Sequence, residues 1–252
     1  MSAATTHKTP MGDFLARNPF PRPFTDGLFF RDKMRALHRI APDMPVNDLL
    51  EVGGGQSGLS AMLYPQAHVT NLDMDPVFAE APVNKGPRIT FRQGDATDLS
   101  FADESFDLVT MFDLLEHVPD DAAVAREVLR VLRPGGWILV STPNRERWRY
   151  PYYRVFKPIC PPEEALFAEW GHVRRGYTQA ELDALFGRPA EATGSFINPL
   201  LAFSHDVSFS TLSPRRRRAL HALLAPVSAL GWATHGPRTS GTEIAAAWRK
   251  PA

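Results

Sequence analysis

The chain has 252 residues, and its 28 Lys and Arg balance its 28 Asp and Glu, so the formal net charge is zero. This balance argues against a generally basic nucleic-acid-binding protein, and no apolar run approaches the ~18 residues that span a membrane. The start of the chain lacks the apolar core of a secretion signal. With the single cysteine, Cys160, an intrachain disulfide and a cysteine-based zinc cluster are excluded. We therefore expect a cytoplasmic protein without a bound metal.

Proline is unusually frequent, at 23 of the 252 residues, or about 9% against a typical ~5%. The N-terminal arm is rich in proline and phenylalanine. It contains Pro10, Pro19, Pro21, Pro23, Phe14, Phe20, Phe24, Phe29 and Phe30. We expect the arm to be extended, because proline disfavours helix, and to lie over a surface groove, because it is too apolar for a free tail. Apolar residues at 30, 34, 37 and 40 then predict a helix.

Strands and helices alternate between residues 47 and 144. We expect strands at 48–52, 68–72, 88–91, 106–111 and 137–141, helices at 58–64 and 121–132, and a turn at 133–136. This alternation predicts an α/β fold with a doubly wound, mostly parallel sheet.

The alternation ends after residue 143. Residues 144–176 are rich in aromatic residues and proline, and a capping box at Thr178 predicts a helix as far as Phe186. A strand is expected at 195–201, and a helix from Ser213 and Pro214 with an apolar stripe of leucines at 220, 223 and 224. Residues 242–248 are typical of a closing strand.

A glycine-rich loop follows the first predicted strand. Gly53, Gly55 and Gly58 satisfy the pattern G-x-G-x-x-G, and Asp73 stands at the end of the next strand. Glycine permits the tight turn and the close approach of a ligand, while a carboxylate in this place accepts hydrogen bonds from ribose hydroxyls. The loop fits any adenosine cofactor, so by itself it leaves both a nicotinamide cofactor and S-adenosylmethionine open.

Three further motifs follow in order. They are Gly94-Asp95-Ala96 after the third strand, 112–120 (FDLLEHVPD) after the fourth, and 132–140 (LRPGGWILV) after an amphipathic helix. With this series the sequence resembles the class I S-adenosylmethionine-dependent methyltransferases, the broad group that includes ubiquinone and natural-product methyltransferases. The resemblance covers 47–144 and continues more weakly through 171–186.

The resemblance implies a Rossmann-like sheet with an antiparallel final strand, S-adenosylmethionine as the cofactor, and a role for the glycine loop. Glu51, Gly53 and Gly55 would surround the methionine part of the cofactor. Asp73 would bind the ribose hydroxyls.

The later motifs would bind the adenine. Asp95 would meet the adenine amino group, Ala96 would offer its backbone, and Phe112 would supply an apolar contact. Asp75 departs from the small polar residue that is frequent two positions beyond the ribose acid.

Candidate catalytic groups follow the fourth and fifth strands. A sulfonium methyl group is already activated, so the protein mainly aligns the reactants, and a general base is needed only where the acceptor arrives protonated. His117 is the first candidate base, with His172 and Tyr177 as further candidates. The alternative is that His117 caps and packs its loop and that His172 and Tyr177 anchor a lid.

Aromatic residues gather between 148 and 177, where they either line a pocket for a flat or apolar acceptor or form a small core of their own. Arg145, Arg147 and Arg149 are candidates for contacting an acidic substrate group. The run Arg215 to Arg218 is either a phosphate-binding element or an exposed, solvated surface.

The sequence thus predicts a methyltransferase that acts on a small-molecule acceptor, with O-methylation as the default. N- or C-methylation, a nicotinamide-dependent oxidoreductase and an inactive cofactor-binding protein are the alternatives. We expect residues 1–46 to form an arm and helix that cover the site. Residues 47–252 then form the methyltransferase domain, with 144–176 and 202–241 as insertions on the substrate side.

Overall fold

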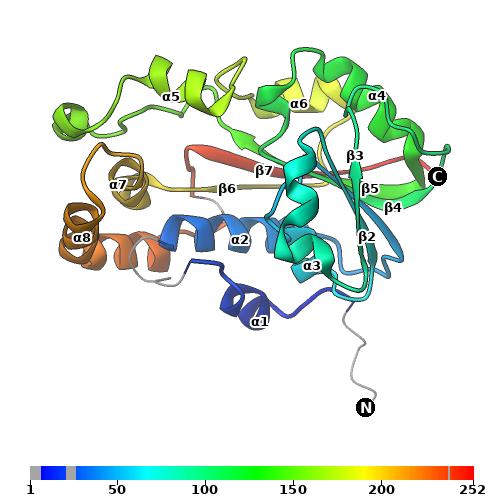
Figure 1. Ribbon diagram of the computed structural model, residues 1–252, viewed down its shortest axis with the longest axis horizontal. Coiled ribbons are helices and arrows are strands. Elements are labelled where there is room, and N and C mark those ends of the chain that lie inside the picture. Colours follow the sequence, from blue (N-terminus) through cyan, green and yellow to red (C-terminus); the bar gives the residue numbers. More distant parts are fainter. Residues whose placement is uncertain (1–6, 21–26, 238) are drawn as a thin grey trace.

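The computed structural model describes residues 7–20, 27–237 and 239–252. One seven-stranded sheet has the order β3-β2-β1-β4-β5-β7-β6 (Figure 1). Its strands are β1 (Asp48–Val52), β2 (His68–Asp73), β3 (Ile89–Gln93), β4 (Phe106–Phe112), β5 (Leu132–Pro143), β6 (Ala192–Phe196) and β7 (Glu243–Arg249). Strands β1 to β5 pair in parallel, and β7 lies antiparallel between β5 and β6. The structure confirms the predicted α/β class and the antiparallel last strand.

Helices cover both faces of the sheet because successive strand residues point to opposite sides. Leu49 and Leu108 face one core, with side chains from α1 (Met11–Ala16), α2 (Leu28–Ile40), α3 (Leu59–Leu63) and α7 (Pro199–Ser208). Leu50 and Val109 face the other core, with α4 (Asp121–Val131) and α6 (Gln179–Leu185). The central strands, such as β1 and β4, are therefore buried on both sides.

The N-terminal arm differs from the predicted extended chain, because residues 11–16 form helix α1. Pro10 is the N-cap of this helix, a position at which a missing backbone N–H costs nothing. The arm is fixed to the domain where the Thr9 N–H donates to the Leu63 carbonyl at 2.8 Å. Phe14 is fully buried against α2. Pro21, Pro23 and Phe24 lie outside the described residues.

Two predicted boundaries are wrong. The turn expected at 133–136 is instead the irregular start of β5, where the pairing with β4 shifts register and Arg133 donates to Asp107 at 2.6 Å. The strand expected at 195–201 ends at Phe196, because Asn198 caps α7 by accepting from the Leu201 N–H at 3.0 Å. Between them Ile197 adopts a positive φ of 58°, which is rare for a β-branched residue.

The remaining helical segments are η1 (Pro76–Glu80), η2 (Pro82–Lys85), η3 (Leu115–His117), η4 (Arg154–Ile159), α5 (Glu163–Trp170) and α8 (Pro214–Thr234). The capping box of α6 is formed as predicted, and α8 begins at Pro214 as predicted. The leucine stripe predicted for α8 is not its buried side. His221, Ser228 and Gly231 are buried instead, because Gly231 lets α8 approach α7 closely.

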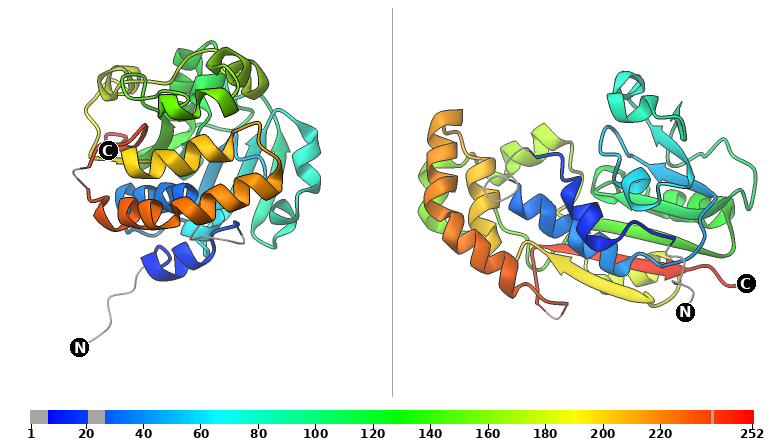
Figure 2. Two further views of the ribbon diagram at one scale, coloured as in Figure 1. Left: turned by 90° about the vertical axis from the view of Figure 1, so that its left-hand side faces the viewer. Right: turned by 90° about the horizontal axis from the view of Figure 1, so that it is seen from below.

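Helices α5, α7 and α8 gather at one end of the molecule, on the left in Figure 1, and α7 and α8 lie side by side (Figure 2). Among the described residues, no helix combines the length and the apolar character that a membrane crossing requires. The helices that follow the regular alternation of strands and helices therefore gather beside one end of the sheet.

Candidate active site

A cavity of about 730 Å³ lies at the carboxyl ends of the first four strands. Its wall includes Gly53 after β1, Asp73 at the end of β2, Asp95 after β3 and Asp113 after β4. In open α/β sheets ligands bind in this crevice, because loops from neighbouring parallel strands converge there. The cavity is large enough for a nucleoside-sized ligand.

The glycine loop forms one wall, and its shape depends on the absence of side chains. Gly53 has a φ of 68°, and a Cβ atom there would lie 2.6 Å from the Leu114 side chain. The Gly55 N–H donates to Asp73 Oδ2 at 3.0 Å, which holds the carboxylate at the cavity. Carboxylate oxygens accept more than one hydrogen bond, so Asp73 keeps capacity for ligand hydroxyls.

Glu51 lies behind this loop rather than on the cavity wall. It is 2% exposed, and burial raises its pKa to about 7, against hydrogen bonds from Ser60 and Ser57 that lower it. The Ser57 hydroxyl donates to its Oε1 at 3.2 Å. Glu51 therefore supports the loop from inside the sheet.

Of the residues expected to bind the adenine, some line the cavity and one lies in the core. Asp95 and Ala96 line the cavity, and the Thr97 N–H and hydroxyl donate to Asp95 Oδ1 at 2.8 and 2.7 Å, which lowers the Asp95 pKa. Phe112 does not line it, because its side chain is buried in the core on the α2 side of the sheet. Asp75, the departure from the family pattern, caps η1 by accepting from the Val77 N–H.

Several residues of this wall carry no motif in the sequence. They are Met74, Phe78 and Thr97. Phe78 packs at 3.7 Å from the position a Gly55 Cβ would take. The sequence indicates that these residues lie at the cavity only because they are close to the motifs along the chain.

A second cavity of about 400 Å³ adjoins the first, and the two share Asp113, His117 and Trp170. Aromatic rings from five separate segments line it. They are Phe29, Phe30, Trp148, Trp170, Phe196 and Phe209. This cavity is suited to a flat or apolar molecule, and its shared wall places such a molecule beside a ligand in the first cavity.

An ion pair stands at the boundary of the cavities. Lys33, from α2, donates to Asp113 Oδ2, and the Ser141 hydroxyl donates to Asp113 Oδ1 at 2.7 Å. Burial raises the pKa of Asp113, but the Lys33 ammonium and these hydrogen bonds outweigh it and hold the pKa below its ordinary value. Asp113 is therefore a carboxylate at neutral pH.

Two further carboxyl groups line the second cavity. Burial raises the pKa of Glu116 and of Glu243, and the negative charge of Asp113 raises both further. The Thr142 hydroxyl donates to Glu116 at 3.0 Å. Within the described residues the Glu243 carboxyl has no hydrogen-bond partner, although Glu243 is only 6% exposed. It is therefore available to a polar group of a bound molecule.

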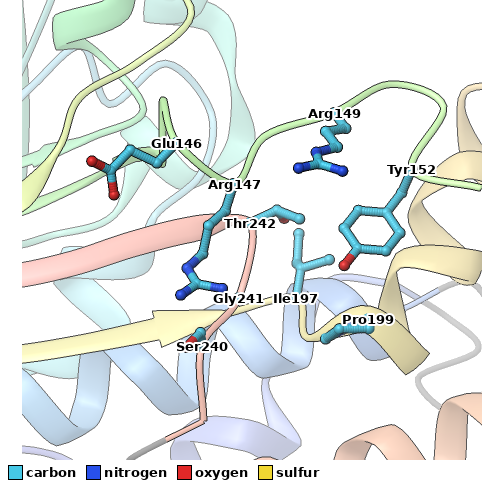
Figure 3. A pocket seen from close by; sticks show the side chains of 9 residues that line it. All are labelled: Glu146, Arg147, Arg149, Tyr152, Ile197, Pro199, Ser240, Gly241 and Thr242. Carbon is cyan, nitrogen blue, oxygen red and sulfur yellow. The ribbon is translucent and has the colours of Figure 1, made fainter.

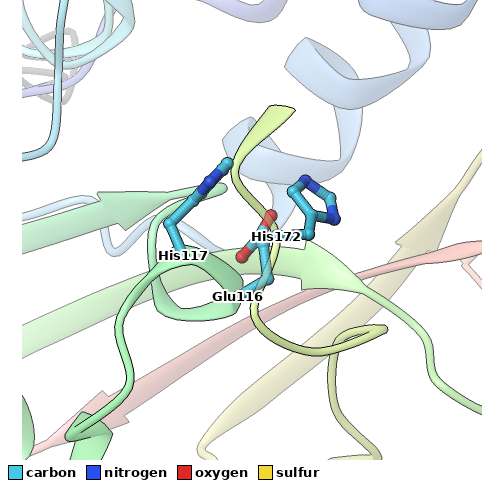
Figure 4. Close-up of side chains that lie close together, drawn as sticks. All are labelled: Glu116, His117 and His172. Atoms are coloured by element: carbon cyan, nitrogen blue, oxygen red, sulfur yellow. The ribbon is translucent and has the colours of Figure 1, made fainter. Parts of the chain in front are cut away.

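His117 and His172 meet at the same boundary. Their ring centroids lie 4.6 Å apart, with the planes perpendicular, and Glu116 lies beside them (Figure 4). Burial and the neighbouring His117 lower the pKa of His172 to about 4, so it is neutral at pH 7. The ligand atoms of the three residues lie within 4.8 Å of one another, a donor set that also suits a metal ion.

Tyr177 lies outside both cavities. Its hydroxyl donates to Asp121 at 2.7 Å and accepts from Arg174 at 2.7 Å. This geometry matches the anchoring role rather than the catalytic one, because the hydroxyl is held by protein groups away from the space for ligands.

The aromatic residues between 148 and 177 both line a cavity and form a small core, the two alternatives that the sequence left open. Trp148 and Trp170 line the second cavity, and Trp148 also packs with Tyr150 and Leu166 in a small core. Arg147 and Arg149 face a separate cavity of about 260 Å³ beside Thr242 (Figure 3). Arg145 instead pairs with Glu181 at 2.7 Å.

The sequence did not indicate three polar residues of the second cavity, Lys33, His205 and Glu243. His205, from α7, packs edge-on against Trp148 with ring centroids 5.2 Å apart, and burial lowers its pKa to about 4. Its ring has no hydrogen-bond partner among the described residues. Each of these residues comes from a helix or strand whose sequence is ordinary, so only the fold brings them together.

Comparisons with known proteins indicate a methyltransferase domain in the part of the chain that runs from β1 to β5. The family model described as a methyltransferase domain matches residues 50–140. A probable S-adenosylmethionine-dependent methyltransferase of Mycolicibacterium smegmatis is 36% identical over 121 residues, which cover 48% of this chain and 47% of the relative. A ubiquinone biosynthesis O-methyltransferase of Pseudomonas syringae is 39% identical over 112 residues, which cover 40% and 47%.

The chain thus spans about half the length of the curated relatives it matches. A solved structure from Thermotoga maritima, described as a possible histamine N-methyltransferase, aligns over 96% of this chain and 100% of its own. Its TM-score is 0.58 at 19% sequence identity, a likeness that shows a shared fold. The second cavity draws most of its wall from outside residues 50–140, the part that the family model matches.

Proposed function

Because residues 50–140 match the methyltransferase domain model and are similar to probable S-adenosylmethionine-dependent methyltransferases, we propose that the chain transfers the methyl group of this cofactor to a small-molecule acceptor. The observation that carries the proposal is the junction of two cavities at Asp113, His117 and Trp170. One cavity has the glycine loop and carboxylates that suit an adenosine cofactor, and the other has the aromatic lining that suits an acceptor. Direct transfer needs the two ligands to touch at one place.

The residues of the first cavity fit the cofactor. Gly53 lines the cavity with backbone atoms alone, and Asp73 and Asp95 supply carboxylates for the ribose and the adenine. When bound, S-adenosylmethionine supplies a methyl group that its positive sulfur has already activated. Trp170 lines both cavities and therefore contacts the space for the cofactor and the space for the acceptor.

We propose that His117 accepts the proton of an acceptor hydroxyl, so that O-methylation is the favoured reaction. His117 lines both cavities, so its imidazole lies where it can meet a hydroxyl of a bound acceptor, and it is close to the Asp113 carboxylate. His172, held neutral by burial, packs edge-on against the His117 ring. Lys33 keeps Asp113 ionised and thus supports the same charge arrangement.

A second candidate, N-methylation, is supported by the carboxyl groups of the acceptor cavity. Glu243 lines this cavity with a carboxyl group that has no hydrogen-bond partner within the described residues, and aromatic faces attract cations. An amine acceptor would find both kinds of partner there. The structure of the product distinguishes the two reactions.

The test is an untargeted mass-spectrometric search. The protein is incubated with host metabolites and S-adenosylmethionine carrying a deuterated methyl group, and products heavier by the labelled methyl are identified. A labelled ether supports O-methylation, and a labelled amine supports N-methylation. Binding of S-adenosylhomocysteine without any labelled product would indicate an inactive binding protein, and calorimetric binding of NADH alone would indicate an oxidoreductase. The cytoplasmic location expected from the sequence stays a prediction.

A further inference from the structure

The outer surface of α8 combines two features that are unusual for solvent-facing helices. Leu223 and Leu230 are 75% and 55% exposed, and their spacing of two turns places them on one side of the helix. Between Ala219 and Thr234 the helix contains no Asp, Glu, Lys or Arg. Helix α8 also forms an outer edge of the molecule (Figure 2). An apolar strip therefore lies uncovered along this edge.

Four arginines stand at the beginning of the same helix. Arg215, Arg216 and Arg218 are exposed and form no ion pair within the described residues, and the first turn of α8 contains no acidic residue. A helix N-terminus already carries a partial positive charge, so the positive charges of these arginines are unfavourable there. A bound anion would relieve this repulsion. Arg217 differs, because its guanidinium donates to the Ser208 carbonyl at 2.7 Å. The three exposed arginines are thus free to meet an external anionic surface.

A groove connects this end of α8 with the acceptor cavity. It has a volume of about 370 Å³ and is lined in part by Pro214, Arg217 and Arg218. It shares Phe29 and Phe209 with the acceptor cavity. An apolar molecule thus has a continuous aromatic wall from the arginine end of α8 to the boundary with the cofactor cavity.

We propose that α8 is a docking helix that lies on an anionic lipid bilayer, with its leucines in the interface and its arginines on the lipid phosphates. An apolar helix face and a cluster of basic residues are the two signals that together give stable peripheral binding. A second copy of the chain is a less suitable partner for the exposed surface of α8, because residues 214–234 contain no Asp or Glu. Pairing of two α8 helices would leave the arginines without carboxylates.

Docking places the groove at the bilayer surface, where an acceptor dissolved in the lipid can reach the aromatic wall at Phe29 and Phe209. This access route rests on the proposed methyl transfer, whereas binding of α8 to lipid does not. The two are therefore tested separately.

The test is co-sedimentation of the full chain with vesicles of phosphatidylcholine mixed with phosphatidylglycerol, and with vesicles of phosphatidylcholine alone. We expect binding to the anionic vesicles, weakened by salt. The triple variant Arg215→Gln, Arg216→Gln, Arg218→Gln is expected to partition on the order of 100-fold less, at about 1 kcal/mol for each basic residue. The matched control replaces Arg88, Arg92 and Arg126, which are exposed near or on β3 and on α4, and should bind as the parent chain does.

Leu223→Gln with Leu230→Gln tests the apolar part and is expected to weaken binding to the anionic vesicles as well. No sedimentation with anionic vesicles, or equal sedimentation of the α8 and control arginine variants, would overturn the proposal. Sedimentation equilibrium without lipid supplies the remaining outcome. A dimer that the leucine variant dissociates would assign this surface to a second copy instead, and a monomer supports the bilayer.

Discussion

The two cavities that meet at His117 are built in opposite ways. The cofactor cavity takes most of its wall from the ends of β1 to β4, which follow one another in the chain and are fixed by parallel pairing. The acceptor cavity is assembled from α2, the segment after β5, the end of α5, the end of β6, α7 and the start of β7. The pairing of the strands thus fixes the wall of the cofactor cavity, whereas the packing of segments distant in the chain fixes the wall of the acceptor cavity. Substitutions on the two walls should therefore affect different properties of the protein.

The largest effect is expected at the junction itself. His117→Ala should lower turnover by about 10²–10⁴-fold, the usual contribution of a general base, with little change in cofactor affinity. His68→Ala, which removes an exposed histidine at the start of β2, is the control and should keep the parent turnover. Single-turnover kinetics with the identified acceptor measure both, and parent-like turnover of His117→Ala would remove His117 from the mechanism.

The buried carboxyl behind the glycine loop gives a pH test of the cofactor side. Because the folded-state pKa of Glu51 is about 7 instead of its ordinary 4.5, the folded chain holds this proton more tightly than the unfolded chain. Its contribution to stability is therefore complete below pH 4.5 and is lost as the pH rises toward 7. The loss amounts to about 3 kcal/mol.

Glu51→Gln should remove this dependence, so the difference in unfolding free energy between parent and variant should change with pH over that range. Urea titrations of the cofactor-free protein measure it. A difference that stays constant from pH 4.5 to 7 would show that Glu51 has an ordinary pKa in the folded chain.

Asp73→Ala should weaken S-adenosylhomocysteine binding by about 1–3 kcal/mol through lost hydrogen bonds to the ribose. Asp75→Ala, two residues away on the exposed cap of η1, is the matched control and should bind as the parent does. Isothermal titration calorimetry gives both affinities. Equal affinities of Asp73→Ala and the parent would place the ribose elsewhere.

Tyr177 distinguishes anchoring from catalysis on the acceptor side. Tyr177→Phe removes the hydroxyl that joins Arg174 and Asp121, so the unfolding free energy should fall by about 1 kcal/mol. Turnover at saturating substrate should stay at the parent value, because the hydroxyl lies outside both cavities. A large fall in turnover without a change in stability would return Tyr177 to the catalytic groups.

The smallest effect is expected from chelation. Lys33 already supplies a positive charge next to Asp113, and Thr142 donates to Glu116, so the proposed mechanism requires no metal ion. EDTA should leave the rate unchanged. Loss of activity that a divalent cation restores would instead identify Glu116, His117 and His172 as metal ligands.

The sequence predicted the regular sheet because its evidence is local. Alternating apolar strands, the glycines at 53, 55 and 58, and acidic residues at strand ends are each visible within a few neighbouring residues. The β5 start and the β6–α7 junction were misjudged because Arg133 and Asn198 act through contacts that depend on the local backbone path.

Most of the residues that line the acceptor cavity could not be predicted from the sequence, for a different reason. Lys33 and Asp113 are 80 positions apart, and Glu243 reaches the cavity only because β7 returns antiparallel beside β5. No spacing rule in one sequence connects such residues. Trp148 and Trp170 were found because aromatic residues are concentrated in one stretch, which is again a local signal.

The most direct test of the central claim is a crystal structure of the protein with S-adenosylhomocysteine. The proposal predicts the ribose on Asp73, the adenine beside Asp95, and the sulfur at the junction of Asp113, His117 and Trp170, facing the aromatic cavity. A cofactor product bound elsewhere, or one whose sulfur faces away from that cavity, would contradict the account.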